Sequence, residues 1–487
     1  MDDAAQNSVS FFSGLYVRSF RIYYHIRWPL IVWVVRTLIP FKLRTHLLLR
    51  FYNLEARLST RSLQKPAQKF LESSIGVKRG VTKIANYRLL AELDEKHGEI
   101  LYCRSDFPPH ALKQRPYWGK PPAPIARRHL DLLPHMVCRI DEGVIEGDCL
   151  GVFVGDVFYS PLLSHVAPDV FACYWKHNLR AIGRLYAFDV MRKSRHVEVE
   201  NVIFLASCQS YGDNYFHFQV DVLPALLNCL KAIEQSELEK YSVIVPASLP
   251  QNIRAFLDIF LTHYSLSTIH LTENTAIRAK NILLASYTSR MPDVIALDRI
   301  GTFHVAPDSI RELREILSEH IRPPALTIGT EDRINVLYLS RRKLGKKGVR
   351  HITNAAEIVE MIAGMGGTVI QPENLTLEEQ MNYMARADCV VCDGGAAVAN
   401  AVFCRAHTPF IVLIHDKGLP HVFMSYADGV YVDIAFVFGK AVEKTFSEPV
   451  HNDCEIPLDL LRSAIDYKQD KNGRTRTSSR VGPHGWL

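Results

Sequence analysis

The segment Ile334-Asn335-Val336-Leu337-Tyr338-Leu339-Ser340 is apolar at most positions, which is typical of a strand buried on both faces of a sheet. An apolar pattern at helical spacing follows over 355–364, and a short apolar run over 367–370 predicts the next strand. The alternation continues through the ranges 377–387, 389–392, 394 onward, 410–414, 429–434 and 458–467. Strands that alternate with helices predict a parallel sheet with helices on both faces.

A second alternation of the same kind precedes this segment. Its expected elements are strands over 201–206, 241–246 and 281–285 and helices over 215–234, 251–264 and 308–320. Short alternating runs over 140–200 predict strands and turns, whereas the Pro- and Arg-rich residues 100–135 indicate a loop. Two successive α/β halves place a cleft between two sheets, where the carboxyl ends of both sets of strands converge.

The composition is that of an ordinary folded protein. Of the 487 residues, 48% are hydrophobic and 22% are charged, which excludes a mainly disordered chain, a collagen-like repeat and a small disulfide scaffold. The 57 Lys and Arg residues outnumber the 51 Asp and Glu residues by 6. Residues 1–60 carry +5 (eight basic, three acidic) and residues 468–487 carry +4 (five basic, one acidic). The body between them is slightly acidic, which excludes a basic nucleic-acid-binding domain.

The N-terminal segment combines aromatic residues with arginines. Its apolar stretch 28–40 is shorter than the roughly 20 residues that a membrane-spanning helix needs, and Arg27 and Arg36 flank its core. Such a segment suits the headgroup region of an anionic membrane, and the alternative is burial against the first domain. No signal peptide is visible at the acidic start. We expect a helical segment over 1–80, α/β domains over 81–305 and 306–467, and a disordered basic tail over 468–487.

The ten cysteines show no metal-ligand spacing. The C-x-x-C pair, Cys389 and Cys392, lies in an expected buried strand without a second pair or a nearby histidine cluster. We therefore expect this pair to be structural, and we expect no metal site. Scattered cysteines of this kind favour a reducing compartment, and the alternative, which the even count allows, is a set of disulfides.

The first candidate cluster, 212–224, follows the strand expected over 201–206. His217 and Asp221 are four residues apart, so on a helix they share one face and can form a hydrogen bond. A carboxylate beside an imidazole orients the ring and supports its protonated form, as a general base requires. The alternative is a core histidine beside a surface acid.

The second candidate cluster, 339–350, follows the strand quoted first. Arg341 and Arg350 belong to a basic run that leaves the carboxyl end of this strand, above the expected cleft. Guanidinium groups bind phosphate oxygens in a bidentate way, so the cluster predicts a diphosphate site. The alternative is a solvated run of charge.

The third candidate cluster, 392–400, lies between an expected strand and a helix. Gly394 and Gly395 would let a ligand approach the backbone, and the helix start offers N–H groups to an anion. The alternative is that these glycines only permit close contact between the strand and the helix.

In this order the three clusters resemble glycosyltransferase family 61. The family has an Asn-Tyr-Tyr-His-like segment ending in Asp-x-Leu-Pro, which 214–217 and 221–224 match. It also has a Ser-Arg turn with a later Arg and Asn, a Glu-Gln helix start and a Gly-Ala-x-x-x-Asn turn. The matching positions are Ser340, Arg341, Arg350, Asn354, Glu379, Gln380, Gly395, Ala396 and Asn400. The resemblance covers roughly residues 140–440. The family usually has a His before the Gly-Ala pair, and Gly394 stands there instead, which implies different donor binding or reduced activity.

The resemblance implies a GT-B-like fold, with two Rossmann-type α/β domains facing a central cleft. It implies an inverting glycosyltransferase that moves a sugar from a nucleotide-sugar donor to a glycan or lipid-linked glycan in polysaccharide biosynthesis, as for a bacterial capsule. No metal or other cofactor is expected, and no nucleic acid partner. The acceptor would bind on the side of 81–305 and the donor on the side of 306–467. The protein would be cytoplasmic and peripheral on the inner face of the bacterial plasma membrane.

The same resemblance assigns roles to residues. His217 or Asp221 would be the base or its orienting partner. Arg341 and Arg350 would hold the diphosphate with the backbone of 394–395. Further donor contacts would come from Asn400, Glu379 and Gln380, although Glu379 and Gln380 could simply cap a helix, and the supporting residues would be Asn214, Ser340 and Asn354.

Two other functions remain compatible with the sequence. One is a pyruvyl or similar group transferase on the same scaffold, which would use phosphoenolpyruvate. The other is a non-catalytic glycan-binding or membrane scaffold subunit, which Gly394 and the N-terminal segment both favour.

Overall fold

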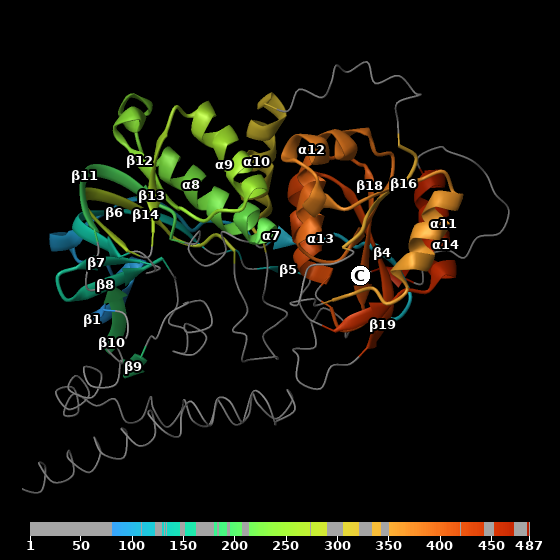
Figure 1. Ribbon diagram of the computed structural model, residues 1–487, viewed down its shortest axis with the longest axis horizontal. Coiled ribbons are helices and arrows are strands. Elements are labelled where there is room, and N and C mark those ends of the chain that lie inside the picture. The colour runs from blue at the N-terminus through green and yellow to red at the C-terminus, as the bar shows by residue number, and fades with distance from the viewer. Residues whose placement is uncertain are drawn as a thin grey trace, which may run out of the picture.

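The computed structural model describes residues 80–471 and 485–486, with gaps at 109, 122–128, 131, 133, 147–150, 162–179, 183–184, 192–194, 207–213, 273, 290–304, 321–333, 342–349, 419 and 443–451. The expectations for the N-terminal segment, for most of the basic run after Arg341 and for the tail therefore lie outside the described residues. The described chain is a mixed α/β protein with two large sheets, each in its own lobe (Figure 1), and a two-stranded sheet of β3 (His110–Ala111) and β5 (His129–Leu130).

The first sheet contains a parallel unit in the order β13-β12-β11-β14. Helices α8 and α9 return the chain between strands, as parallel pairing requires. The apolar runs at 201–206, 241–246 and 281–285 belong to three of these strands, as predicted. The elements are β11 (Arg195–Phe204), α8 (Leu223–Lys231), β12 (Ser242–Pro246), α9 (Gln251–His263), β13 (Ser267–Leu271) and β14 (Thr275–Ala285).

Further strands extend this sheet beyond β14, mostly in antiparallel pairs. They follow the order β6-β7-β8-β1-β10-β9, and β2 also pairs with β6. Within the range 140–200, where strands and turns are expected, the described residues before Arg195 thus form strands that do not add to the parallel unit. The elements are β1 (Gly80–Leu89), β2 (Gly98–Arg104), β6 (His135–Glu146), β7 (Val152–Val154), β8 (Val157–Ser160), β9 (Arg180–Ile182) and β10 (Leu185–Met191).

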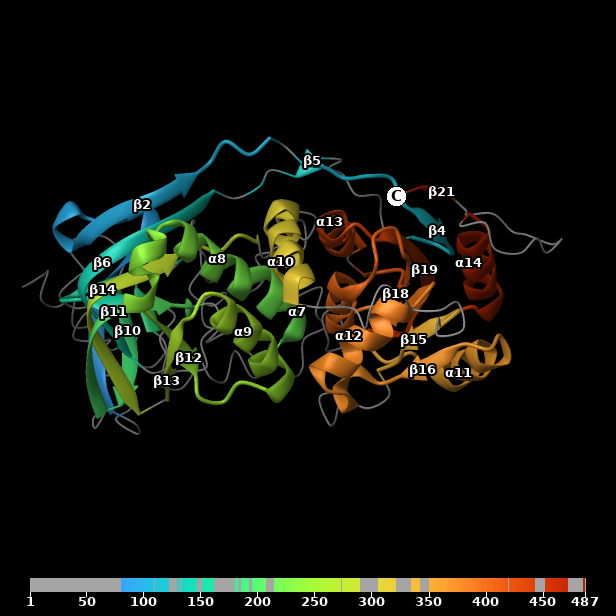
Figure 2. The same cartoon turned by 90° about the horizontal axis from the view of Figure 1, so that it is seen from above.

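The second sheet has the order β16-β15-β17-β18-β19-β4-β21, and its strands from β16 to β4 pair in parallel. Figure 2 shows α12 and α13 on the face towards the first lobe and α11 and α14 on the far face. The elements are β4 (Pro116–Trp118), β15 (Leu337–Leu339), α11 (Ala355–Gly364), β16 (Thr368–Ile370), α12 (Leu377–Arg386), β17 (Val390–Asp393), β18 (Pro409–His415), α13 (Pro420–Val430), β19 (Asp433–Val442), α14 (Leu458–Lys471) and β21 (Gly485–Trp486).

Each sheet has a point where the strand order reverses. In the first sheet this point lies between β11 and β14, and in the second between β15 and β17. Open α/β sheets bind ligands at such a switch point, outside the carboxyl ends of the strands. The topology therefore marks one candidate ligand position in each lobe.

Two elements differ from the sequence-based expectation. The helix expected from 394 is the 3₁₀ helix η10 (Ala396–Phe403). The strand expected over 429–434 begins only at Asp433, because Gly429 still belongs to α13. A Cβ on Gly429 would lie 2.7 Å from the Ile310 Cβ, so this glycine allows α13 to approach α10 (Pro307–His320) closely.

The segment expected as a loop over 100–135 crosses from one lobe to the other (Figure 2). It starts in β2 of the first sheet and supplies β4 to the second, where Tyr117 and Trp118 pair with β19. Trp118 is fully buried there. Further along the interface, the buried carboxylate of Asp428 on α13 accepts hydrogen bonds from Arg115 and, at 3.0 Å, His110. A chain range expected in the first domain thus helps to build the second lobe.

The two lobes also share one apolar core. A continuous cluster of buried side chains includes Leu226 and Phe256 of the first lobe and Val390, Phe403 and Tyr426 of the second. Burial of apolar surface is the dominant favourable contribution to folding, so this shared core holds the lobes together.

Candidate functional site

His217 lies at the carboxyl end of the first sheet, on the short helix α7 (Tyr215–His217) that follows β11. The Asn214 side chain starts this helix, because its Oδ1 accepts hydrogen bonds from the backbone N–H groups of Phe216 (3.1 Å) and His217 (3.3 Å). The next turn, Phe218–Val222, is a π-helix. π-Helical turns are rare in proteins, and those that occur are often found at functional sites.

His217 and Asp221 form the pair that their spacing predicts. The Nδ1 of His217 lies 2.8 Å from Oδ2 of Asp221, and the Ser289 hydroxyl donates to the other carboxylate oxygen. The Asp221 side chain is 1% exposed and that of His217 is 18% exposed. Burial raises the pKa of Asp221, and the hydrogen bond from His217 opposes this effect. Because the carboxylate holds the proton on Nδ1, the basic lone pair of the imidazole is on Nε2.

Two residues that follow β14 contact the π-helical turn and Asp221, and the sequence analysis did not identify them. Thr288 and Ser289 are buried, and the Thr288 hydroxyl donates to the carbonyl of Val220 in the π-helix at 3.2 Å. Ser289 binds Asp221 as described. Both follow a predicted strand directly, so the rule that ligand sites lie at the carboxyl ends of strands could have found them.

Arg341 marks the switch point of the second sheet. Ser340 and Arg341 leave β15, and Asp393 ends the neighbouring strand β17. The backbone N–H of Arg341 donates to Oδ2 of Asp393 at 2.9 Å, and the Tyr338 hydroxyl donates to Oδ1 at 2.8 Å. Burial raises the pKa of Asp393 to about 6. Asp393 is a site residue that the sequence analysis did not single out.

The two glycines after β17 have different neighbours. A Cβ on Gly395 would lie 2.5 Å from Nη1 of Arg341, so the bare backbone makes room for the guanidinium. A Cβ on Gly394 would lie 2.8 Å from the Leu413 carbonyl oxygen, which accepts the Gly394 N–H. No side chain fits at 394 without a shift of the backbone. The histidine of the family pattern therefore has no space at this position.

Other expected donor-side residues have structural hydrogen bonds. Asn354 bridges to the backbone of Ile456, through Nδ2 at 2.7 Å and Oδ1 at 3.0 Å. Glu379 forms a capping box with Thr376 at the start of α12. Buried Gln380 donates to the Pro372 carbonyl at 2.9 Å. No described contact brings these three side chains to Arg341.

The remaining two expected residues have distinct surroundings. Arg350 has a positive φ of 62° and immediately precedes His351, whose N–H donates to Asp453 at 2.9 Å. Asn400 is 1% exposed, and its Oδ1 has no hydrogen-bond partner among the described residues. The Nη1 atom of Arg341 is also buried and has no hydrogen-bond partner within the described part of the chain. Both are buried polar atoms without a described partner, which is uncommon in folded proteins and marks this turn as unusual.

The elements that follow the two switch points contact one another across the lobe interface. Helix α7 packs against η10, which follows Gly395 directly. The ring of Phe216, next to His217, lies 5.9 Å from that of Phe423 and 5.3 Å from that of Tyr426 on α13. The base candidate of one lobe and the guanidinium of the other thus belong to one region.

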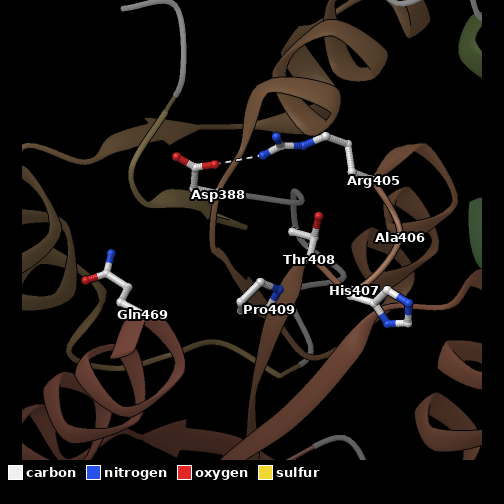
Figure 3. Close-up of a pocket in the computed structure, with 7 residues that line it drawn as sticks. All are labelled: Asp388, Arg405, Ala406, His407, Thr408, Pro409 and Gln469. Carbon is white, nitrogen blue, oxygen red and sulfur yellow. Dashed lines mark hydrogen bonds and ion pairs between the residues drawn. The ribbon is translucent and has the colours of Figure 1, made fainter. Parts of the chain in front are cut away.

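A cavity of about 280 Å³ in the second lobe lies elsewhere (Figure 3). Asp388 and Arg405 pair across it at 2.8 Å. It sits where β17 and β18 begin, at the edge opposite Gly394. Its lining residues are Asp388, Arg405, Ala406, His407, Thr408, Pro409 and Gln469.

Neither a metal-ligand cluster nor a bilayer-crossing helix is present among the described residues. They contain no group of three or more His, Cys, Asp or Glu side chains placed to hold a metal ion. None of their helices combines the length and the apolar character needed to cross a bilayer.

The fold and the two switch points define an α/β protein with a histidine–carboxylate pair in one lobe and a cationic turn in the other. Residues 215–411 match the family model described as Glycosyltransferase 61, which supports membership of that family and a sugar-transferring enzyme. The match begins at the helix of His217 and includes Arg341, Gly394 and Asn400. A search of curated proteins found no match to the chain.

Proposed function

We propose that this protein is an inverting glycosyltransferase of the GT-B type. It transfers a sugar from a nucleotide-sugar donor to a glycan or lipid-linked glycan during polysaccharide biosynthesis, such as that of a bacterial capsule. The observation that carries the proposal is the His217–Asp221 pair at one switch point, on a helix that contacts η10, which begins next to Arg341 at the other. The first lobe binds the acceptor and the second binds the donor.

The donor diphosphate binds at the second switch point. Arg341 supplies charge-assisted hydrogen bonds, and the start of η10 supplies N–H groups next to Gly395. Arg350 and Asn400 are further donor contacts. As the glycosidic bond to the diphosphate breaks, negative charge grows on the leaving group, and these fixed positive groups stabilise it. With this charge in place the transfer needs no metal or other cofactor.

His217 is the general base. Both oxygens of Asp221 accept hydrogen bonds, and the Asp221 side chain is 1% exposed. The His217 side chain is 18% exposed. Because Nδ1 of His217 holds the proton that is shared with Asp221, the basic lone pair of the ring is on Nε2. Nε2 takes the proton of the acceptor hydroxyl while that oxygen attacks the anomeric carbon from the face opposite the diphosphate. A single displacement of this kind inverts the configuration. Asp221 and Ser289 hold the imidazole in place.

The protein acts at the inner face of the plasma membrane in this proposal, held there by residues 1–60. About 1 kcal/mol per basic residue at an anionic surface adds to the insertion of the apolar stretch. Deletion of 1–60 should abolish salt-sensitive binding to anionic vesicles and leave donor hydrolysis intact. A truncated chain that unfolds would show that the segment is buried instead.

The experiment for the activity is a panel of nucleotide sugars incubated with the full chain. Release of a nucleoside diphosphate from one donor, and its loss in His217→Ala when an acceptor is supplied, supports the proposal; mass spectrometry then identifies the product. Transfer from phosphoenolpyruvate instead would show a pyruvyl transferase. If no nucleotide is released from any donor and the protein still binds glycan, it is a non-catalytic scaffold.

A further inference from the structure

A polar contact links the turn that follows His217 to the second lobe. Gln219 lies between His217 and Asp221 in the π-helical turn and is fully buried. Its Oε1 is 2.7 Å from the Tyr426 hydroxyl on α13. Tyr426 is itself fully buried, and burial raises its pKa well above the usual value. The hydroxyl therefore keeps its proton and remains a hydrogen-bond donor.

The same hydroxyl reaches the donor-side turn. It lies 2.8 Å from the carbonyl oxygen of Ala399, four residues after Gly395 and next to Asn400. One oxygen atom thus joins the helix turn that carries His217 to the 3₁₀ helix that follows the diphosphate position. The segments it connects come from different lobes and from different switch points.

The other contacts between α7 and α13 described here are apolar, and they constrain the orientation of the two helices less strictly than a hydrogen bond does. The Phe216 ring packs on Tyr426 and Phe423, and dispersion contacts of this kind tolerate small sliding movements better than a hydrogen bond does. The Tyr426 oxygen lies 2.7 Å from the amide group of Gln219 and 2.8 Å from the carbonyl oxygen of Ala399. Its one proton serves Ala399 when the amide N–H₂ of Gln219 donates to the hydroxyl oxygen, so the hydroxyl can link both segments by directional hydrogen bonds.

We propose that Tyr426 is a positioning residue that sets the distance between the base His217 and the donor bound at the second lobe. This inference rests on the proposed function. Tyr426 touches neither substrate in this proposal; it acts through the Gln219 turn on one side and the Ala399 turn on the other. Displacement of a catalytic group by about 1 Å can reduce a rate about 10²-fold, so a loosened contact is detectable.

The test is Tyr426→Phe, which removes one oxygen and keeps the ring. We expect kcat for sugar transfer to fall about 10-fold to 10²-fold, with the donor dissociation constant within about threefold of wild type. In a His217→Ala background the same substitution should have no further effect on kcat, because there is no base left to place. Gln219→Met removes the partner group and should reproduce the result.

Tyr159→Phe is the matched control. Tyr159 is also fully buried, but its hydroxyl contacts His97 Nδ1 at 2.8 Å within the first lobe. We expect a lower melting temperature and an unchanged kcat for this variant. If Tyr426→Phe lowers the melting temperature and leaves kcat unchanged, as the control does, the inference is wrong. The inference is also wrong if Tyr426→Phe lowers kcat by the same factor in the His217→Ala background as in the wild type. Full transfer activity in His217→Ala alone would instead remove His217 as the base, whereas the absence of transfer from every nucleotide sugar by the wild type would overturn the proposed function.

Discussion

The guanidinium of Arg341 lies against the backbone of Gly395, where a Cβ atom would come within 2.5 Å of Nη1. These two residues leave neighbouring parallel strands at the point where the strand order of the second sheet reverses. The cation therefore lies beside the N–H groups that start η10, and both favour an anion at the same place. The missing side chain of Gly395 thus makes room for the guanidinium of Arg341.

Substitution of Arg341 should weaken donor binding without unfolding the protein. We expect Arg341→Ala to raise the donor KM and to lower kcat, because charge-assisted contacts to the diphosphate strengthen as the leaving group departs. Arg341→Lys should recover only part of the activity, since an ammonium group cannot reproduce the bidentate geometry. Steady-state kinetics with the active donor measures both. Unchanged kinetics in the alanine variant would remove Arg341 from the site.

A histidine at 394 should not improve the enzyme. Its Cβ would lie 2.8 Å from the Leu413 carbonyl oxygen, so β17 and β18 must separate. We expect Gly394→His to lower the free energy of unfolding by about 1–3 kcal/mol, as for other overpacked sites, and to give no gain in donor affinity. Gly364→His is a matched control, because nothing lies within 4 Å of a Cβ at that position. A stable Gly394→His variant with tighter donor binding would contradict this account.

The fold was predictable from the sequence where the local hydrophobic pattern of a segment matches the strand or helix that the sheet topology requires there. The apolar run 334–340 and the alternation after it led to the parallel second sheet, because a buried strand with helical crossovers has few other solutions. The contribution of β4 was not predictable. Tyr117 and Trp118 form a strand only because β19, more than 300 residues later, offers an unpaired edge. Such a contact leaves no periodicity in a Pro-rich segment.

The site was predictable to a similar degree. His217 and Asp221 meet because their spacing suits one helix face, and the structure brings them to 2.8 Å. Ser289 lies 68 residues after Asp221 in the chain, so only the sheet topology brings the two together. Glu379 matched a family motif, yet it caps α12. A motif gives residue types, whereas the hydrogen bonds of the folded chain decide their use.

The buried carboxyl of Asp393 should make stability depend on pH. Its pKa rises from 3.8 to about 6 on folding because of burial, so between these values the folded state binds more protons than the unfolded chain. Stability must then fall as the pH rises through this window. Relative to Asp393→Asn, the wild-type free energy of unfolding should drop by roughly 3 kcal/mol between about pH 3.5 and about pH 7. Denaturant titrations of both proteins measure the difference, and a difference independent of pH would refute the assignment.

The crossing strand should make the lobes unfold together. Trp118 is fully buried in the second lobe and its ring lies 5.5 Å from that of Tyr467 on α14. We expect Trp118→Ala to destabilise the protein by about 3–5 kcal/mol and to keep a single unfolding transition, because the shared core couples the lobes. Ile100→Ala, at an exposed position on β2, should change stability by less than about 0.5 kcal/mol. Two separate calorimetric transitions would show that the lobes are independent.

The His217–Asp221 pair gives the sharpest separation of roles. His217→Ala should lower kcat for transfer about 10²-fold to 10⁴-fold and leave donor affinity within a few-fold, since the base acts on the acceptor hydroxyl and not on the diphosphate.

Asp221→Asn should lose less, because an amide oxygen can still accept from Nδ1, and Ser289→Ala should lose least because it removes one donor to the carboxylate. Transfer rates at saturating donor, together with nucleotide titrations, give the order of the three variants. If Asp221→Asn loses as much as His217→Ala or more, the carboxylate is the base and the imidazole is its partner. If His217→Ala loses donor affinity and kcat together, His217 instead contacts the donor.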